Sequence, residues 1–334
     1  MSLKIKKMNT ALVVWRSFKD LAGHRGTRFE IDFPEHIGDF KFVKKIFQDR
    51  RHNKFLFALY EDKNGKEFIA KQVSLKDPGL DEYWLRNEIS VYESITNLYK
   101  EKGEEIKKYF PRFSIPKLAG VVDDNERLLG LIEKVEGETL FEIPVPERLK
   151  IMIEGINYFK YLNTIHNFKG QVMTSRSIWQ IIIILFLALF GSLQKNIDDY
   201  KIIYKGFCTL FVNIPWLLTQ TDKRLIHRDI GYSNILTGPN GNYLIDFELS
   251  ALANPMFEVT QMAVGCWPRE GFIESFLNSE FYDSIMKNKK ERRLYKLFTI
   301  YSGIHALATH TKNDSPTAHK IEIIRTYLKH GLEI

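Results

Sequence analysis

One stretch in the second half of the chain holds polar side chains at a spacing that suits group-transfer chemistry. It contains His227-Arg228-Asp229, then Asn234, and then Asp246 beyond an Asn-Gly turn. A carboxylate such as that of Asp229 orients an acceptor hydroxyl, and the oxygens of Asn234 and Asp246 are hard ligands that suit Mg²⁺. Moving a phosphoryl group needs mainly such alignment and the neutralisation of phosphate charge. The pattern therefore indicates phosphoryl transfer to a hydroxyl.

The sequence around these residues predicts two kinds of element. In the first part of the chain, short aromatic or β-branched runs predict strands, and an Asn-Gly turn between the second and third predicts a hairpin. Apolar residues three and four apart then predict a helix. From Gly137 onward the pattern is mostly helical. The predicted strands are residues 41–47, 54–61, 67–73, 117–123 and 127–135, and the first predicted helix is residues 81–102.

The spacing of His227-Arg228-Asp229, Asn234 and Asp246-Phe247 resembles that of the protein-kinase-like fold, in the branch of aminoglycoside phosphotransferases and choline kinases. The resemblance implies an α+β, bilobal protein. Its small antiparallel-sheet N-lobe would take residues 1–136, and its mainly helical C-lobe residues 137–334. The resemblance also implies ATP and Mg²⁺ as cofactors, with Asp229 as the catalytic residue and Asn234 and Asp246 as metal ligands.

The resemblance extends to the predicted N-lobe. Phe68-Ile69-Ala70-Lys71 matches the strand motif whose lysine contacts the α- and β-phosphates, and Glu88 on the predicted helix would orient that lysine. Glu93, on another face of the helix, is the rival partner. Residues 131–137 resemble the hinge between lobes, where backbone groups of Glu133 to Val135 would meet the adenine. The sequence leaves open which of them does so, and whether this is simply a strand ending in a turn.

The segment that should cover the phosphates contains no glycine. Residues 48–54 read Gln-Asp-Arg-Arg-His-Asn-Lys. Because glycine lets backbone amides approach a phosphate closely, a standard glycine-rich loop is absent from the sequence. Either Arg50, Arg51 or Lys54 substitutes by charge, or the segment is a solvated hairpin tip.

Two features favour a small-molecule kinase over a protein kinase. Glu248 follows Asp246-Phe247 where protein kinases have glycine, and no Ala-Pro-Glu motif comes after it. About ninety residues separate Gly137 from His227, which resembles the helical insertion that forms the acceptor pocket in small-molecule kinases. Arg228, by contrast, stands where that branch usually has glycine, and we expect it to form a local ion pair.

We therefore expect an enzyme, an ATP-dependent phosphotransferase that moves the γ-phosphate to a hydroxyl of a small molecule. The sequence does not identify the acceptor. An atypical Ser/Thr protein kinase and a nonenzymatic nucleotide-binding pseudokinase remain the alternatives. The glycine-free loop favours a pseudokinase, whereas the presence of Lys71, Asp229, Asn234 and Asp246 argues against one.

A long apolar run, Ser177–Gln194, contains no charged residue and reaches the lower limit for crossing a bilayer. A single crossing would place Lys71 and Asp229 on opposite sides of a membrane, which one kinase cleft does not allow. We therefore expect a buried helix of the C-lobe. The alternative is a membrane-associated hairpin through residues 177–218, which we do not favour.

Composition limits the remaining possibilities. With 44% hydrophobic and 27% charged residues in 334, the chain is neither disordered nor a coiled coil. A net charge of +7 suits anionic ligands, but we expect no nucleic-acid partner and interpret Lys287–Arg293 as a solvated helix end. Two distant cysteines, Cys208 and Cys266, predict no disulfide framework and a cytoplasmic location. The oligomeric state stays open.

Overall fold

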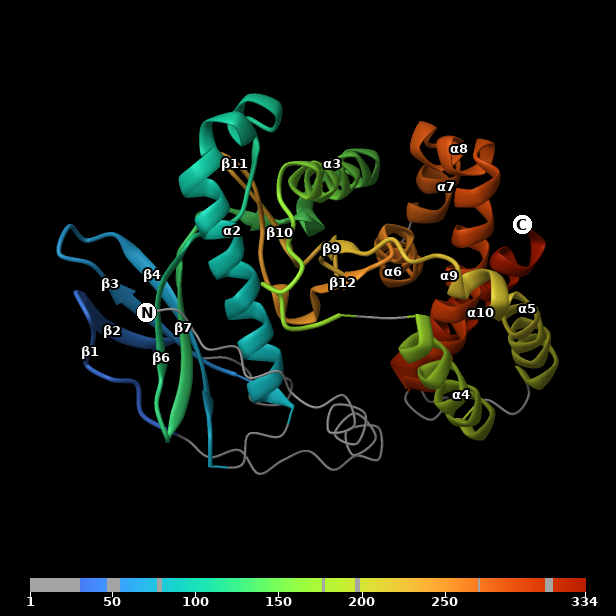
Figure 1. Ribbon diagram of the computed structural model, residues 1–334, viewed down its shortest axis with the longest axis horizontal. Coiled ribbons are helices and arrows are strands. Elements are labelled where there is room, and N and C mark those ends of the chain that lie inside the picture. Colours follow the sequence, from blue (N-terminus) through green and yellow to red (C-terminus); the bar gives the residue numbers. More distant parts are fainter. Residues whose placement is uncertain are drawn as a thin grey trace. The chain divides into compact units, whose positions relative to one another are not determined.

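The computed structural model describes residues 31–46, 55–76, 80–175, 178–195, 199–269, 271–309 and 315–334 (Figure 1). The chain forms two compact units, which we treat separately. The sheet unit consists of Met1–Glu138, Phe168–Thr174 and Leu236–Ser250. The helical unit consists of Thr139–Asn167, Ser175–Ile235 and Ala251–Ile334.

A six-stranded sheet in the order β1-β2-β3-β4-β7-β6 dominates the sheet unit, and every neighbouring pair in it is antiparallel. Alternation of side chains places Tyr60, Phe68 and Leu131 in a core on one face of the sheet. The strands are β1 (His36–Ile37), β2 (Phe40–Ile46), β3 (Leu56–Glu61), β4 (Glu67–Ser74), β6 (Leu118–Asp123) and β7 (Arg127–Glu133). The predicted antiparallel sheet is therefore confirmed.

Helix α2 (Asp81–Tyr109) packs on the other face of this sheet, through Leu85 and Ile89. The close approach requires a glycine: a Cβ added to Gly130 would lie 2.9 Å from the side chain of Ile89. The helix runs past the predicted end at residue 102, but Lys102 has a non-helical φ of −130°. The predicted end thus coincides with a kink rather than with the end of the helix.

A second, four-stranded sheet has the order β5-β11-β10-β8. The Asn-Gly turn predicted after Asn234 joins β10 (Ile235–Gly238) to β11 (Gly241–Leu244), and Gly241 has a φ of +120°, which favours glycine. The other two strands are β5 (Phe113–Ser114) and β8 (Glu138–Thr139). A short 3₁₀ helix, η3 (Phe247–Leu249), follows β11 and packs against α2.

The helical unit is built around α9 (Lys289–Thr309), which contacts α4, α5, α6, α8 and α10. A short antiparallel pair, β9 (Arg224–Ile226) and β12 (Ala251–Ala253), brackets the loop that carries Asp229. The remaining elements are η1 (Leu140–Glu142), α3 (Val145–Ile165), α4 (Ile178–Lys195), α5 (Tyr200–Leu218), α6 (Pro255–Cys266), α7 (Phe272–Leu277), α8 (Glu280–Lys287) and α10 (Ser315–Glu333). The mixed fold, an antiparallel sheet with one helix and then a helical part, agrees with the predicted α+β class.

The long apolar run forms α4, but α4 is not the fully buried helix that the sequence predicts. One side packs against α9 and α5 and is buried, at Ile181, Ile182, Leu185 and Ala188. The opposite side faces solvent, at Trp179, Ile183, Phe186 and Phe190. Within the described residues, no helix combines the length and hydropathy that a membrane span requires. An apolar sequence shows that every side of a helix is hydrophobic. It does not show which of those sides other helices will cover.

Candidate active site

Lys71 is the centre of a buried ion cluster in the sheet unit. Its side chain leaves β4 on the face covered by α2, and the residue is only 5% exposed. The Nζ atom donates to Glu88 Oε2 at 2.6 Å and to Asp246 Oδ1 at 2.9 Å, and it lies 3.8 Å from Glu248 Oε2. The Phe55 ring centroid is 4.3 Å from the same nitrogen. The structure thus brings together Lys71, Glu88 and Asp246, and the helix residue that meets Lys71 is Glu88 rather than Glu93.

The charges of this cluster are unequal, because one ammonium faces three carboxylates. Burial opposes the charged ammonium, but attraction from Glu88, Asp246 and Glu248 outweighs it and raises the pKa of Lys71 above its ordinary value. Burial, opposed by Lys71 and aided by the neighbouring carboxylates, raises the pKa of Glu88 to about 7. An excess of carboxylate oxygen at this position suits a divalent cation.

Asn87, next to Glu88 on α2, holds the backbone that follows Asp246. Its buried amide nitrogen donates to the carbonyl oxygens of Glu248 at 3.0 Å and Ser250 at 2.8 Å, and its Oδ1 accepts the N–H of Thr174 at 3.1 Å. Asp246 itself has a left-handed backbone, with a φ of +63°. Sequence reasoning missed Asn87. An asparagine in the interior of a helix, where it is disfavoured, is the signal that was available.

Asp229 and Asn234 lie together in the helical unit. The Asn234 amide nitrogen donates to Asp229 Oδ2 at 2.8 Å and to the Asp229 carbonyl oxygen at 2.9 Å. The Ser233 hydroxyl donates to Asn234 Oδ1 at 3.1 Å. Asn234 is buried whereas Asp229 is exposed. The loop therefore exposes the Asp229 carboxylate to solvent, and the hydrogen bonds from Asn234 hold it in place.

Glu258 on α6 clamps the backbone just before Asp229. Its Oε1 accepts the N–H of Arg228 at 2.9 Å, and its Oε2 accepts the N–H of His227. Burial, opposed by these two hydrogen bonds, raises the pKa of Glu258 to about 7. Arg228 is held in a left-handed conformation, with a φ of +70°. Sequence reasoning missed this clamp, although a single carboxylate in the apolar helix α6 could have indicated it.

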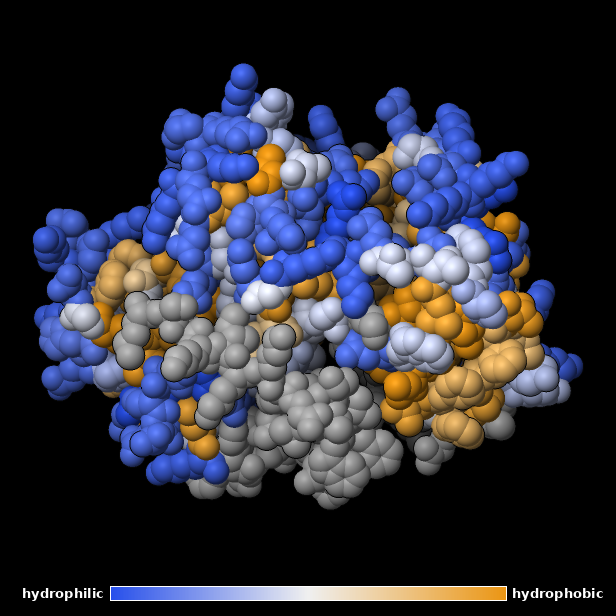
Figure 2. All heavy atoms as spheres, in the orientation of Figure 1, coloured by the Kyte–Doolittle hydropathy of each residue, from blue (hydrophilic) through white to orange (hydrophobic). Residues whose placement is uncertain are grey.

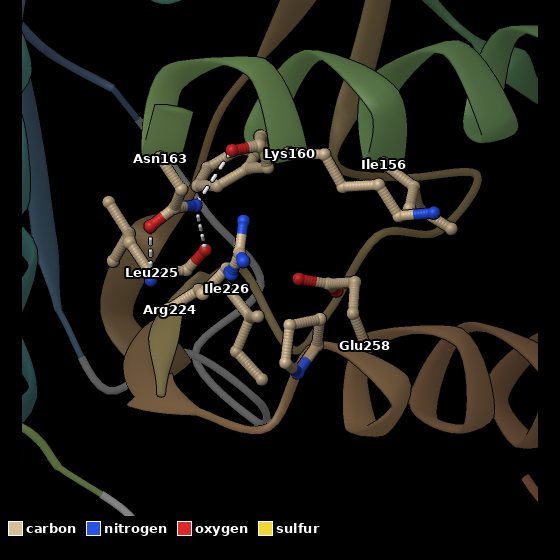
Figure 3. A pocket seen from close by; sticks show the side chains of 9 residues that line it. Ile156, Lys160, Asn163, Arg224, Leu225, Ile226 and Glu258 are labelled. Carbon is tan, nitrogen blue, oxygen red and sulfur yellow. Dashed lines mark hydrogen bonds between the residues drawn. The ribbon is translucent and has the colours of Figure 1, made fainter. Parts of the chain in front are cut away.

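The same loop is also fixed at its start, as Figure 3 shows. Asn163 on α3 accepts the N–H of Leu225 at 2.8 Å and donates to its carbonyl oxygen at 2.9 Å, which pins β9. These groups line a pocket together with Lys160, Arg224 and Glu258 (Figure 3). Two helices, α3 and α6, therefore set the position of the Asp229 loop through backbone hydrogen bonds.

The predicted hinge residues lie at the end of β7. The N–H of Glu133 donates to the Lys117 carbonyl oxygen at 2.9 Å, and that of Lys134 to the Glu67 carbonyl oxygen at 3.1 Å. The Glu133 carboxylate pairs with Lys66. Because those two backbone donors already serve the sheet, Val135 remains our candidate for the adenine contact. The predicted phosphate contacts Arg50, Arg51 and Lys54 lie outside the described residues.

The oxygen-bearing side chains of the two clusters suit a divalent metal only in part. Among the described residues, no group of three or more His, Cys, Asp or Glu side chains is arranged to hold a metal ion. Magnesium, however, keeps several waters and is often bound through one or two carboxylates together with substrate phosphates. The Asp246 carboxylate in the sheet unit and the Asn234 amide oxygen in the helical unit are each of the ligand type that suits an ion brought by a nucleotide.

Sequence comparison identifies no relatives for this chain. No protein-family model matches it, and no curated protein matches it either.

Comparison with solved structures, in contrast, gives a consistent result. A thermostable mutant of the aminoglycoside phosphotransferase APH(4)-Ia, in a ternary complex with ADP and hygromycin B, aligns with a TM-score of 0.56 at 10% identity, over 88% of this chain and 94% of its own. Amicoumacin kinase hAmiN, with AMP-PNP, Ca²⁺ and Ami, aligns at 0.52 and 13% identity, over 97% and 96%. Choline kinase from Cryptosporidium parvum Iowa II aligns at 0.50 and 13% identity, over 89% of both chains. The chain therefore has the protein-kinase-like fold of aminoglycoside phosphotransferases and choline kinase.

Proposed function

We propose that this chain is an ATP-dependent phosphotransferase that moves the γ-phosphate of ATP to a hydroxyl of a small molecule. The observation that carries the proposal is the buried ion cluster of the sheet unit. Lys71 meets Glu88, 17 positions away, and Asp246, 175 positions away, within hydrogen-bonding distance. In protein-kinase-like enzymes the lysine that binds phosphate pairs with a helix glutamate beside the aspartate that holds the metal ion, and Lys71, Glu88 and Asp246 have this arrangement.

In this proposal the sheet unit binds the nucleotide. Lys71 contacts the α- and β-phosphates, and Glu88 keeps its ammonium aimed because both groups are buried and hydrogen-bonded. Asp246, together with Asn234, ligates Mg²⁺, which neutralises phosphate charge when bound. Val135 contributes backbone contacts to the adenine.

Asp229 handles the acceptor. Its exposed carboxylate accepts a hydrogen bond from the acceptor hydroxyl, aligns the oxygen with the γ-phosphorus and takes the proton as transfer proceeds. Asn234 donates to one oxygen of the same carboxylate and so holds its orientation. Such alignment accounts for most of the catalysis that phosphoryl transfer requires.

The compared structures support the choice of acceptor class. They include an enzyme complexed with hygromycin B, a kinase complexed with amicoumacin and a choline kinase. All three are named for small molecules, although they differ in chemistry. We therefore propose a small-molecule alcohol and leave its identity open, since a shared fold does not fix a substrate.

The proposal is tested by measuring ADP release from Mg²⁺-ATP across a panel of aminoglycosides, amino alcohols, sugars and lipid-linked alcohols. The Asp229→Asn variant serves as control. The expected result is ADP release that depends on at least one acceptor and is lost in the variant. Nucleotide binding without acceptor-dependent turnover would contradict the proposal in favour of a pseudokinase, and phosphorylation of a protein substrate alone would favour a protein kinase.

A further inference from the structure

The outer side of α4 and α5 is apolar where a solvent-facing helix normally is polar. On α4 the exposed residues follow each other at intervals of four, three and four positions, which makes a single stripe: Trp179, Ile183, Phe186 and Phe190. On α5 the exposed large side chains are Tyr200, Tyr204, Phe211 and Val212. Exposure in this set ranges from 38% at Phe186 to 72% at Val212. We call these eight residues the aromatic patch.

The two stripes form one surface. Phe207 of α5 stands between them, with its ring centroid 5.3 Å from that of Phe186 and 6.0 Å from that of Phe211. Figure 2 shows this as a broad hydrophobic area over α4 and α5 at the lower right of the view. Contiguous exposed patches of this type mark interaction sites.

The charged residues within α4 and α5 themselves are all lysines. Lys201 and Lys205 are exposed on α5, each next to a patch tyrosine. Asp199 is the only acidic residue among the described residues of α4, α5 and their junction, and its carboxylate is paired with Arg325 at 2.7 Å. The surface thus combines exposed aromatic rings with exposed lysines.

A second basic group adjoins the far end of α5. Arg293, at the start of α9, donates to Asn213 Oδ1 at 2.7 Å and lies over the Trp216 ring at 4.1 Å. The stretch that ends at Arg293 is exposed and strongly basic, with Lys287, Lys289, Lys290 and Arg292 against a single Glu291. Lysine and arginine flank the apolar surface at both ends of α5.

We propose that the aromatic patch binds the surface of an anionic phospholipid bilayer, with α4 and α5 lying in the interface. Tryptophan and tyrosine favour the headgroup level, lysines extend from apolar surface to reach headgroups, and basic residues are attracted to anionic lipid. A second copy of the chain fits less well, because it would bring the same positive charge against itself. This binding goes beyond the proposed phosphotransferase function and does not depend on it.

The experiment is flotation of the purified full chain with vesicles of phosphatidylcholine alone or mixed with phosphatidylglycerol. The wild type should float with the anionic vesicles. Phe190→Ser combined with Phe211→Ser should weaken partitioning by about tenfold or more, since each ring buries apolar area. Lys201→Gln combined with Lys205→Gln should weaken binding to anionic vesicles by about tenfold and reduce its salt sensitivity, while the basic stretch before Arg293 keeps the remainder.

The matched control is Tyr109→Ser, which removes an aromatic residue that is 60% exposed at the end of α2, outside the aromatic patch. It should float like the wild type. All variants change exposed residues, and unaltered circular dichroism and thermal midpoints would verify their folds. A wild type that ignores both vesicles, or a phenylalanine variant that binds normally, would overturn the proposal. Dimers dispersed by the phenylalanine substitutions, without vesicle binding, would overturn it in favour of a second copy.

A fluorescence measurement locates the contact independently. Acyl-brominated phosphatidylcholine, mixed into the anionic vesicles, should quench tryptophan emission of the wild type. Trp179→Phe keeps the apolar contact but removes the fluorophore, so it should lose most of the quenching while still floating. Quenching that is unchanged in Trp179→Phe would contradict insertion of α4.

Discussion

The two candidate clusters are held in different ways. In the sheet unit, Lys71 is surrounded by three carboxylates and its geometry depends on charge. In the helical unit, Asp229 lies on a loop whose backbone N–H groups donate hydrogen bonds to Glu258 and Asn163 and are fixed by them. The first arrangement suits binding of a charged ligand, and the second suits aiming one carboxylate. The geometry of the first cluster should therefore depend on its charges, and that of the second on the hydrogen bonds that hold its backbone.

The largest expected effect is a loss of turnover at Asp229, the residue that we propose orients the acceptor rather than binding the nucleotide. Asp229→Asn keeps the shape of the side chain but removes the proton acceptor, so we expect a loss of about 10³-fold in kcat, within the range for a general base. The thermal midpoint should stay unchanged, because the carboxylate is exposed. Steady-state kinetics with the acceptor found by screening provide the measurement, and Asp222→Asn, at an exposed aspartate of the same unit, should be neutral. Near-normal turnover in Asp229→Asn would exclude its catalytic role.

Lys71→Met should break the charge-held cluster. It leaves the buried Glu88 carboxylate without its cation, and removing one partner of a buried pair costs about 3–5 kcal/mol of unfolding free energy. Adding Glu88→Leu should restore much of the stability but none of the nucleotide affinity. Urea unfolding and nucleotide titration measure the two effects, with Lys66→Met, at an exposed lysine in the turn before β4, as control. If Lys71→Met alone unfolds like the wild type, the cluster does not contribute as described.

Glu258 gives the helical unit a pH dependence of definite sign. Its pKa of about 7 in the folded state lies above the ordinary 4.5, so the folded state retains a proton that the unfolded state releases. The stability that Glu258 contributes is therefore fully present below pH 4.5 and is lost as pH rises to 7, by about 1.4 kcal/mol per unit of pKa difference. Glu258→Gln has no titrating group at this position. Its free energy of unfolding should be lower than that of the wild type at acidic pH. Between pH 5 and 8 this free energy should fall by about 2 kcal/mol less than that of the wild type. Urea unfolding of the wild type and the variant across that range is the measurement. If the two stabilities changed with pH in parallel, the raised pKa of Glu258 would be contradicted.

The smallest expected effect concerns the left-handed backbone at Arg228. Because a Cβ disfavours this conformation, Arg228→Gly should be more stable than Arg228→Ala by about 1 kcal/mol. At Arg292, an exposed position of helix α9, the order should reverse, since glycine weakens helices. Thermal unfolding of the four variants makes the comparison. The same order at both positions would show that the turn at Arg228 stores no strain.

Sequence patterns predicted those features of the fold and site whose signal lies within a single segment of the chain. Hairpin turns, strand alternation and the motifs around Lys71 and Asp229 are local, so the antiparallel sheet and the α+β class could be predicted. Asn87 and Glu258 could not be found by spacing, because they bind backbone groups of segments 161 and 31 positions away. The exposed side of α4 was missed for a related reason: burial depends on which neighbours the fold supplies.

The division of labour between the clusters is tested most directly by calorimetric titration of Mg²⁺-ATP into the wild type, Asp246→Asn and Asp229→Asn. Loss of the Asp246 carboxylate should weaken binding by at least about tenfold, since Mg²⁺ depends on few protein ligands. Asp229→Asn should bind like the wild type while failing to turn over. Wild-type affinity in Asp246→Asn, or an equal loss of affinity in both variants, would contradict the account.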